Sequence, residues 1–121
     1  TRITLDNTLD HYEGILMVEP LSYLEFNFLV KNSFAVITDS GGITEETTVM
    51  GIPCLTLRDN TERPETVNLG TNELIGANAN AIGPAVNRLL SGSLKKGTVP
   101  EKWDGHAAER IVEKLEKLLS D

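Results

Sequence analysis

A Ser-Gly-Gly turn between a predicted strand and a predicted helix is the segment best suited to chemistry. Ser40, Gly41 and Gly42 follow the apolar run Phe34–Thr38, and a helix is expected to open at about Ile43. Glycines let a ligand approach the backbone, and the first free N–H groups and the positive dipole end of the helix then face that ligand. The turn therefore predicts an anion site, preferably for phosphate, with the Ser40 hydroxyl and the N–H groups of Gly42 and Ile43 as donors.

A second interpretation of the same turn stays open from these residues alone. Ser40 could only cap the helix while the glycines only form the turn, and the segment lacks the lysine of a Walker loop. Glu46 favours a ligand, because it lies four residues after Gly42 and one helical turn above the anion site. There it can accept two hydrogen bonds from a vicinal diol such as that of ribose. Glu45 is expected to point elsewhere, as a surface acid.

Two arginines follow the next predicted strand. Arg58 and Arg63 are candidate phosphate partners, since a guanidinium group matches a pair of anionic oxygens. For Arg58, salt bridges with Asp59 and Glu62 that would order the loop remain an equal alternative. Phe26, on a preceding helix, is expected either to belong to the core or to line a pocket for a base.

Strand-like and helix-like segments alternate along the chain. Short apolar runs predict strands at Gly14–Val18, Phe34–Thr38, Cys54–Leu57 and Asn72–Ile75. Helical spacing and breakers predict helices at Ser22–Lys31, Thr44–Met50, Ala79–Leu90 and Ala107–Leu119, with Pro64 opening a short one. The first dozen residues look like the tail of a further helix. We therefore expect residues 1–121 to form one doubly wound α/β domain, with a parallel sheet covered on both faces.

Composition excludes several classes of function. The net charge of −7 leaves no basic stripe for nucleic acid. No apolar run approaches the roughly 20 residues of a membrane span, and no signal peptide opens the chain, so we expect a cytosolic protein. The single Cys54 permits neither a disulfide nor a cysteine zinc site. His11 and His106 show no metal-binding spacing, and no nucleophile–base pair is evident, so we predict no metal, no cofactor and no complete catalytic set.

Several ordered motifs together resemble a known family. TDSGGITEE, GIPCLTLRDNTERPE, GTNELIG and the closing DGHAAERIVEKL are similar to the C-terminal half of the non-hydrolysing UDP-N-acetylglucosamine 2-epimerases. The resemblance implies a GT-B architecture, in which two Rossmann-like domains hold a nucleotide sugar between them. It also implies that the N-terminal domain is not part of this chain.

The resemblance suggests a role for each candidate site residue. It places Phe26 at the uracil, Glu46 at the ribose and Arg63 in the substrate site, with a diphosphate-binding turn formed by Ser40, Gly41 and Gly42. Leu21 departs from the family pattern, which commonly has a polar residue such as Gln there. A side-chain contact to the edge of the base is therefore absent or replaced by backbone.

The family reaction interconverts UDP-N-acetylglucosamine and UDP-N-acetylmannosamine by eliminating UDP and adding it back. The resemblance places the acids and bases in the N-terminal domain and in a segment before Thr1, so we expect no catalytic residue here and no activity of the chain alone. The UDP-sugar and the other domain are the expected partners, with a homodimer also possible in this family. A hydrolysing variant, the donor domain of a GT-B glycosyltransferase and a stand-alone nucleotide-sugar module remain alternatives.

Overall fold

The computed structural model describes residues 12–120. The helix tail predicted at the start of the chain lies almost wholly outside this part. Three short parallel strands form the sheet, β1 (Val36–Thr38), β2 (Cys54–Thr56) and β3 (Asn72–Leu74), in the order β1-β2-β3. Val36 pairs with Cys54, and Cys54 pairs with Asn72. Three of the four predicted strands are thus confirmed, each shortened at one end.

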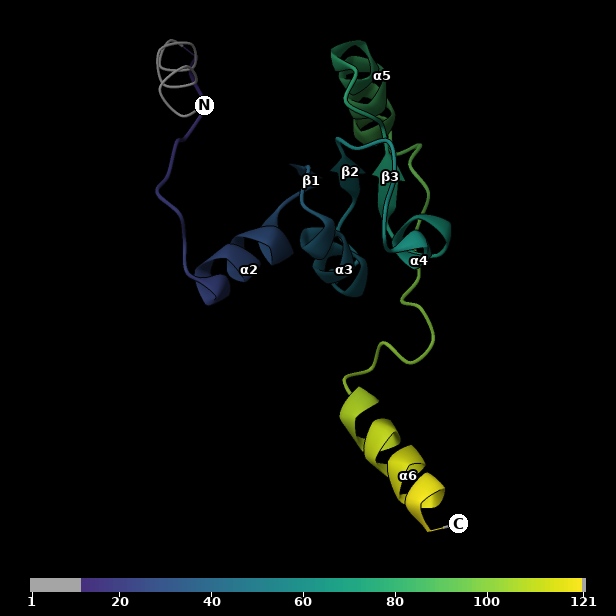
Figure 1. Cartoon of the computed structure of the whole chain (residues 1–121). Coiled ribbons are helices and arrows are strands. Elements are labelled where there is room, and N and C mark those ends of the chain that lie inside the picture. The colour runs from purple at the N-terminus through teal and green to yellow at the C-terminus, as the bar shows by residue number, and fades with distance from the viewer. Residues whose placement is uncertain (1–11, 121) are drawn as a thin grey trace.

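Helices cover both faces of this sheet. On one face Leu55 packs with Ala85 and Leu89 of α5 (Ala79–Leu90). The strand residues on either side of Leu55 point the opposite way, toward α3 (Gly41–Met50) and α4 (Pro64–Asn68). Figure 1 draws α5 on the other side of the strands from α3 and α4. The prediction of a doubly wound fold is therefore confirmed, as is the short helix that opens at Pro64.

The layer between the sheet and the helices α3 and α4 is polar. The Thr56 hydroxyl donates to the side-chain oxygen of Asn72 at 2.5 Å, and the amide nitrogen of Asn72 donates to the Thr66 hydroxyl at 3.2 Å. All three side chains are buried. A buried polar group without a partner is costly, so this chain of bonds fixes how the strands and α4 fit together.

Gly70 is a position where this packing requires glycine. A Cβ atom there would lie 2.4 Å from the Thr48 hydroxyl oxygen and 2.6 Å from the Thr66 carbonyl oxygen. Both distances are far inside van der Waals contact. The chain between α4 and β3 can therefore pass beneath α3 only without a side chain.

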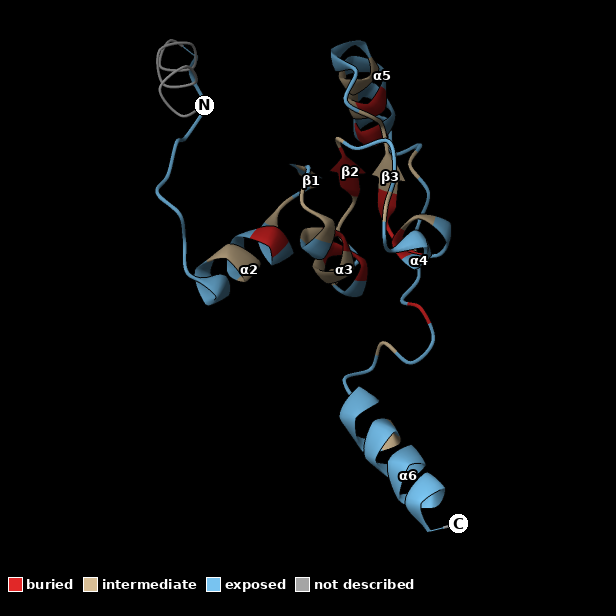
Figure 2. Ribbon diagram, viewed as in Figure 1, coloured by how far each residue is buried: buried red, intermediate tan, exposed pale blue. Residues whose placement is uncertain are grey.

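The helices α2 and α6 lie at the margins of the structure. α2 (Tyr23–Asn32) begins with a capping box between Ser22 and Glu25 and contacts α3. α6 (Ala107–Leu119) has no buried residue, and Figure 2 shows it exposed and separate from the sheet. No helix of the described residues is long and apolar enough to span a membrane.

Two predictions about the elements are wrong. Gly14–Val18 forms no strand, and its large side chains are exposed, because no strand among residues 12–120 lies beside it to offer a hydrogen-bonded ladder. The helix α3 begins at Gly41, not at about Ile43, since both glycines adopt helical geometry. The Ser-Gly-Gly segment is therefore the first turn of the helix itself.

Candidate functional site

The loops that follow the three strands meet at one edge of the sheet. Ser40 stands between β1 and α3, and the loop containing Arg58 and Arg63 leaves β2. The Leu57 N–H donates to the Thr38 carbonyl at 2.8 Å, and the Gly76 N–H donates to the Arg58 carbonyl at 3.2 Å. This is the carboxyl edge of the strands, where open α/β sheets bind their ligands.

Ser40 is the N-cap residue of α3, but its side chain does not cap the helix. Its backbone is extended, with φ −81° and ψ 124°, and its hydroxyl makes no capping hydrogen bond. The Ser40 N–H instead donates to the Thr38 hydroxyl at 3.0 Å. The first amides of α3 therefore receive no side-chain cap from Ser40, which contradicts the purely capping interpretation and leaves them for another acceptor.

The fold does not require glycine at either position of the first turn of α3. A Cβ at Gly42 would meet nothing within 4 Å, and one at Gly41 would lie at an ordinary contact distance of 3.7 Å from Arg58 Nη1. Neither residue has a positive φ. Alanine would favour the helix by up to about 1 kcal/mol. Open approach to the backbone, as an anion would need, is the physical reason that remains for glycine here.

Both arginines share a cavity with these glycines. The cavity has a volume of about 280 Å³ and is lined by Gly41, Gly42, Glu45, Arg58, Thr61, Glu62 and Arg63. Within the described part of the chain, Arg58 forms neither of the alternative salt bridges, to Asp59 or to Glu62. The sequence left open whether Arg58 lies at the glycine turn, and the structure places it there.

Arg63 is held by Glu45, a contact that the sequence did not predict. Arg63 Nε donates to Glu45 Oε1 at 2.6 Å, and Arg63 Nη1 lies 3.4 Å from the Glu62 carbonyl oxygen. The bond to Glu45 raises the pKa of Arg63 above its ordinary value. The expectation that Glu45 points elsewhere is wrong, because the loop after β2 folds back over the first turns of α3.

Glu46 and Phe26 line separate hollows. Glu46 shares one of about 260 Å³ with Tyr23, Glu45, Val49 and Met50, so it adjoins the cavity of the two arginines through Glu45. Phe26 lines an apolar hollow of about 340 Å³ beside β1, together with Ile43 of α3. Of the predicted site residues, the structure therefore joins Gly41, Gly42 and Arg63 in one cavity and arranges the others around α3.

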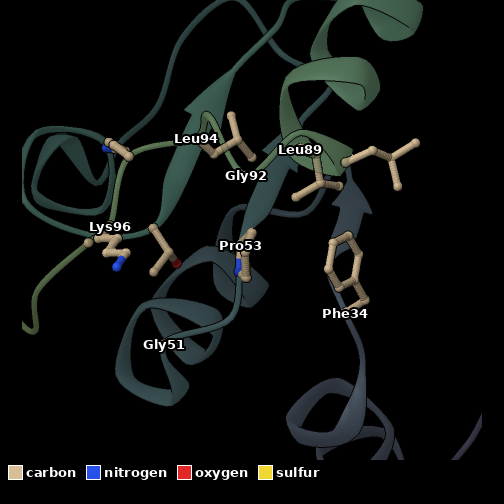
Figure 3. Close-up of a pocket in the computed structure, with 11 residues that line it drawn as sticks. Phe34, Gly51, Pro53, Leu89, Gly92, Leu94 and Lys96 are labelled. Atoms are coloured by element: carbon tan, nitrogen blue, oxygen red, sulfur yellow. The ribbon is translucent and has the colours of Figure 1, made fainter.

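Another cavity lies at the opposite edge of the sheet. Figure 3 shows Phe34, Pro53, Leu89 and Leu94 around it, and its volume is about 360 Å³. Phe34 precedes β1 and Pro53 precedes β2, so this cavity faces the amino ends of the strands. Its position and its largely apolar wall distinguish it from the cavity that contains the two arginines. Among the described residues, no group of three or more His, Cys, Asp or Glu could hold a metal ion.

A parallel α/β sheet with an open glycine turn and two arginines at its carboxyl edge defines a Rossmann-like domain with a candidate site for an anionic ligand. Residues 1–116 match the family model described as UDP-N-acetylglucosamine 2-epimerase. The chain belongs to this family, as its motifs predicted.

Sequence relatives support this membership. A UDP-N-acetylglucosamine 2-epimerase of Methanocaldococcus jannaschii is 46% identical over 108 residues, which cover 89% of this chain and 29% of that protein. One of Yersinia pestis is 38% identical over 115 residues, covering 92% of this chain and 31% of that protein. The chain therefore spans less than a third of the length of these relatives.

Solved structures agree with the fold. The M. jannaschii UDP-GlcNAc 2-epimerase in complex with UDP-GlcNAc and UDP aligns with a TM-score of 0.79 at 41% identity, over 96% of this chain and 32% of that chain. The S. aureus MnaA–UDP structure aligns with a TM-score of 0.85 at 35% identity, over 98% of this chain and 33% of that one. The prediction of a Rossmann-like domain of a GT-B architecture is confirmed.

Proposed function

We propose that this chain is the UDP-holding, C-terminal domain of a UDP-N-acetylglucosamine 2-epimerase, and that residues 1–121 form this single domain. One observation supports it most strongly. Gly41 and Gly42 leave the start of α3 unobstructed in a cavity that also contains two arginines, although the fold needs glycine at neither position. A diphosphate is a ligand that uses both the free amides and the guanidinium groups.

In this proposal the diphosphate occupies the cavity beside the first turn of α3. It accepts hydrogen bonds from the Ser40 hydroxyl and from the N–H groups of Gly42 and Ile43, while Arg58 and Arg63 neutralise its charge. Glu46, one helical turn further along α3, accepts the ribose hydroxyls. At this separation its carboxylate reaches the sugar hydroxyls and not the phosphates.

On the far side of α3, Phe26 provides the aromatic surface for uracil. It is half-buried in the apolar hollow beside β1, and Ile43 of α3 lines the same hollow. The start of α3 therefore separates a polar cavity from an apolar one. A nucleotide has the same division between its phosphates and its base.

The whole protein then interconverts UDP-N-acetylglucosamine and UDP-N-acetylmannosamine by eliminating and re-adding UDP. Negative charge grows on the leaving diphosphate during elimination, and a fixed helix N-terminus stabilises it without having to reorganise. The same contacts keep UDP next to the intermediate, so that it re-adds at a high effective concentration. We assign the acids and bases to the remainder of the protein, and we expect closure of its domains to exclude water. The cytosolic location and the homodimer remain predictions from the sequence.

Titration of UDP into the intact protein that carries this chain tests the proposal. We expect UDP to bind, and Glu46→Ala and Arg63→Ala each to weaken binding by about tenfold, the loss typical of a hydrogen bond to a charged group. Asn87→Ala, on the exposed side of α5, is a control that should leave the affinity unchanged. Intact protein that does not bind UDP would refute the assignment, and product analysis would separate epimerisation from hydrolysis.

A further inference from the structure

We propose that Glu45 is a positioning residue, which holds Arg63 through Nε so that the outer edge of its guanidinium group faces the diphosphate. This inference rests on the proposed function, because it explains what orients the arginine of the same site. Neither the sequence pattern nor the family motifs assign this role to Glu45.

Arg63 and Glu45 contact each other directly at the cavity wall. Arg63 Nε donates to Glu45 Oε1 at 2.6 Å, and both side chains line the cavity that contains Gly41 and Gly42. The two residues are 18 positions apart, with Glu45 in α3 and Arg63 at the end of the loop before α4. The contact therefore ties the loop after β2 to the helix whose first amides we propose as the anion site.

Part of the Arg63 guanidinium group remains available to a ligand. A guanidinium group has five N–H donors, and Glu45 uses the one on Nε. Nη1 makes only a long contact of 3.4 Å to the Glu62 carbonyl oxygen, and no acceptor among the described residues contacts Nη2. The pair of N–H groups on the outer edge is thus left for a phosphate, which binds guanidinium groups through two parallel hydrogen bonds.

Other contacts already fix the backbone of Arg63. Its N–H donates to the Thr61 hydroxyl at 3.0 Å, and Pro64 begins α4 directly after it. Glu45 then fixes the far end of the side chain from α3. The two anchors reduce the side-chain entropy that Arg63 would otherwise lose on binding an anion.

The position of the pair argues against a purely stabilising role. The Arg63 side chain is 51% exposed and the Glu45 side chain 40% exposed. Salt bridges at such exposure contribute little to folding because water screens them. Removing Glu45 should therefore affect ligand binding more than stability.

A competing interpretation is that Glu45 only repels the diphosphate and occupies Arg63 until the ligand displaces it. The two interpretations predict opposite signs for one variant. If Glu45 positions Arg63, Glu45→Ala weakens UDP binding. If Glu45 competes with the ligand, Glu45→Ala and Glu45→Gln both strengthen it.

The experiment is a calorimetric titration of UDP into the intact protein and five variants, one of them Arg63→Ala. We expect Glu45→Ala to weaken affinity about tenfold, and Glu45→Gln to recover most of it, because the glutamine oxygen still accepts from Nε. The double variant Glu45→Ala/Arg63→Ala should bind no more weakly than Arg63→Ala, because Glu45 acts through Arg63. Glu65→Gln removes a charge near Arg63 but outside the cavity wall, so it is the control that should leave the affinity unchanged.

The inference is overturned if Glu45→Ala binds UDP as well as or better than the parent protein. It is also overturned if glutamine fails to rescue, or if the losses from Glu45→Ala and Arg63→Ala simply add. Circular dichroism and unfolding curves verify that every variant is folded. If the parent protein itself does not bind UDP, the proposed function fails; if it binds and Glu45→Ala binds equally well, only the role of Glu45 fails.

Discussion

Gly42 stands in the first turn of α3, and apart from its chain neighbours and the backbone of its own helix nothing lies within 4 Å of where its side chain would begin. Because its φ is not positive, Gly42→Ala should stabilise the fold, by up to about 1 kcal/mol. The same methyl group would project toward the proposed diphosphate and should reduce UDP affinity severalfold. Denaturant unfolding and a UDP titration of the same variant measure both effects. Asn87→Ala also introduces a better helix former, so it should raise stability and leave the UDP affinity unchanged.

Gains in stability and losses in affinity rarely occur together by accident. If Gly42→Ala binds UDP normally, the first turn of α3 does not contact the ligand. If it destabilises the protein, the glycine serves the fold after all. Either result would remove the main support for the proposed function.

Asp104 provides a prediction of pH dependence. Its carboxylate pairs with Arg110, and Arg110 Nη1 donates to Asp104 Oδ1 at 3.0 Å. This bond, together with the His106 N–H, lowers the pKa of Asp104 from 3.8 to about 2. Because the folded-state pKa is the lower one, the pair's contribution is present above pH 3.8 and is lost as the pH falls through about 2. An NMR titration should show this midpoint, and Arg110→Ala should move it back up.

At the residue scale, the sequence predicted the glycine turn and Arg63 but not their surroundings. The strand–turn–helix pattern was enough to place Gly41 and Gly42 at the carboxyl edge of the sheet. The contact between Glu45 and Arg63 depends on how the loop after β2 folds back, and local spacing does not determine that. For the same reason the sequence could not decide whether Arg58 is available to a phosphate or forms a salt bridge within its loop. That depends on its position beside Gly41, which only the fold defines.

At the scale of elements, Gly70 joins α4 to β3 beneath α3. A Cβ there would overlap the Thr48 hydroxyl and the Thr66 carbonyl, so Gly70→Ala should destabilise the domain by about 1–3 kcal/mol. Urea unfolding followed by circular dichroism measures the loss. Asn68→Ala, exposed at the end of α4, is the matched control and should change stability by less than about 0.5 kcal/mol.

The elements that the sequence predicted best are those with a strong helical period. The bounds of α5 and α6 agree with the prediction, because their apolar spacing extends over three turns. The strand predicted at Gly14–Val18 was wrong because an apolar run indicates only that a segment could be buried. Whether it forms a strand depends on a neighbouring strand with which it can pair. The polar threonine layer under α3 was not anticipated, since threonine in a helix usually indicates exposure rather than a buried hydrogen-bonded position.

At the scale of the whole molecule, the chain exposes more surface than a compact domain of its size. Its accessible area is 9104 Å², whereas the scaling for compact monomers gives about 6,400 Å² at this mass. Part of the excess is apolar, on the segment 15–18, on α2 and on the stripe Ile111, Leu115 and Leu118 of α6. The core therefore depends on the sheet with α3, α4 and α5.

The exposed stripe of α6 leads to a prediction. Replacing Ile111 and Leu115 together by lysine should change the unfolding free energy of the sheet domain by less than about 0.5 kcal/mol, because α6 buries no side chain. Leu89→Ala, in the core on α5, should instead destabilise it by about 2–5 kcal/mol. Denaturant unfolding of this chain compares the two. A large loss from the lysine variant would mean that α6 packs on the domain in solution.

Cys54, the chain's single cysteine, lies wholly buried in the middle strand, and burial raises the pKa of its thiol. A protonated, inaccessible sulfur does not react with alkylating reagents until the strands separate around it. The protein thus carries its own chemical reporter of global opening: the rate at which iodoacetamide consumes this thiol under native conditions follows how often the sheet comes apart, with no label or engineered probe.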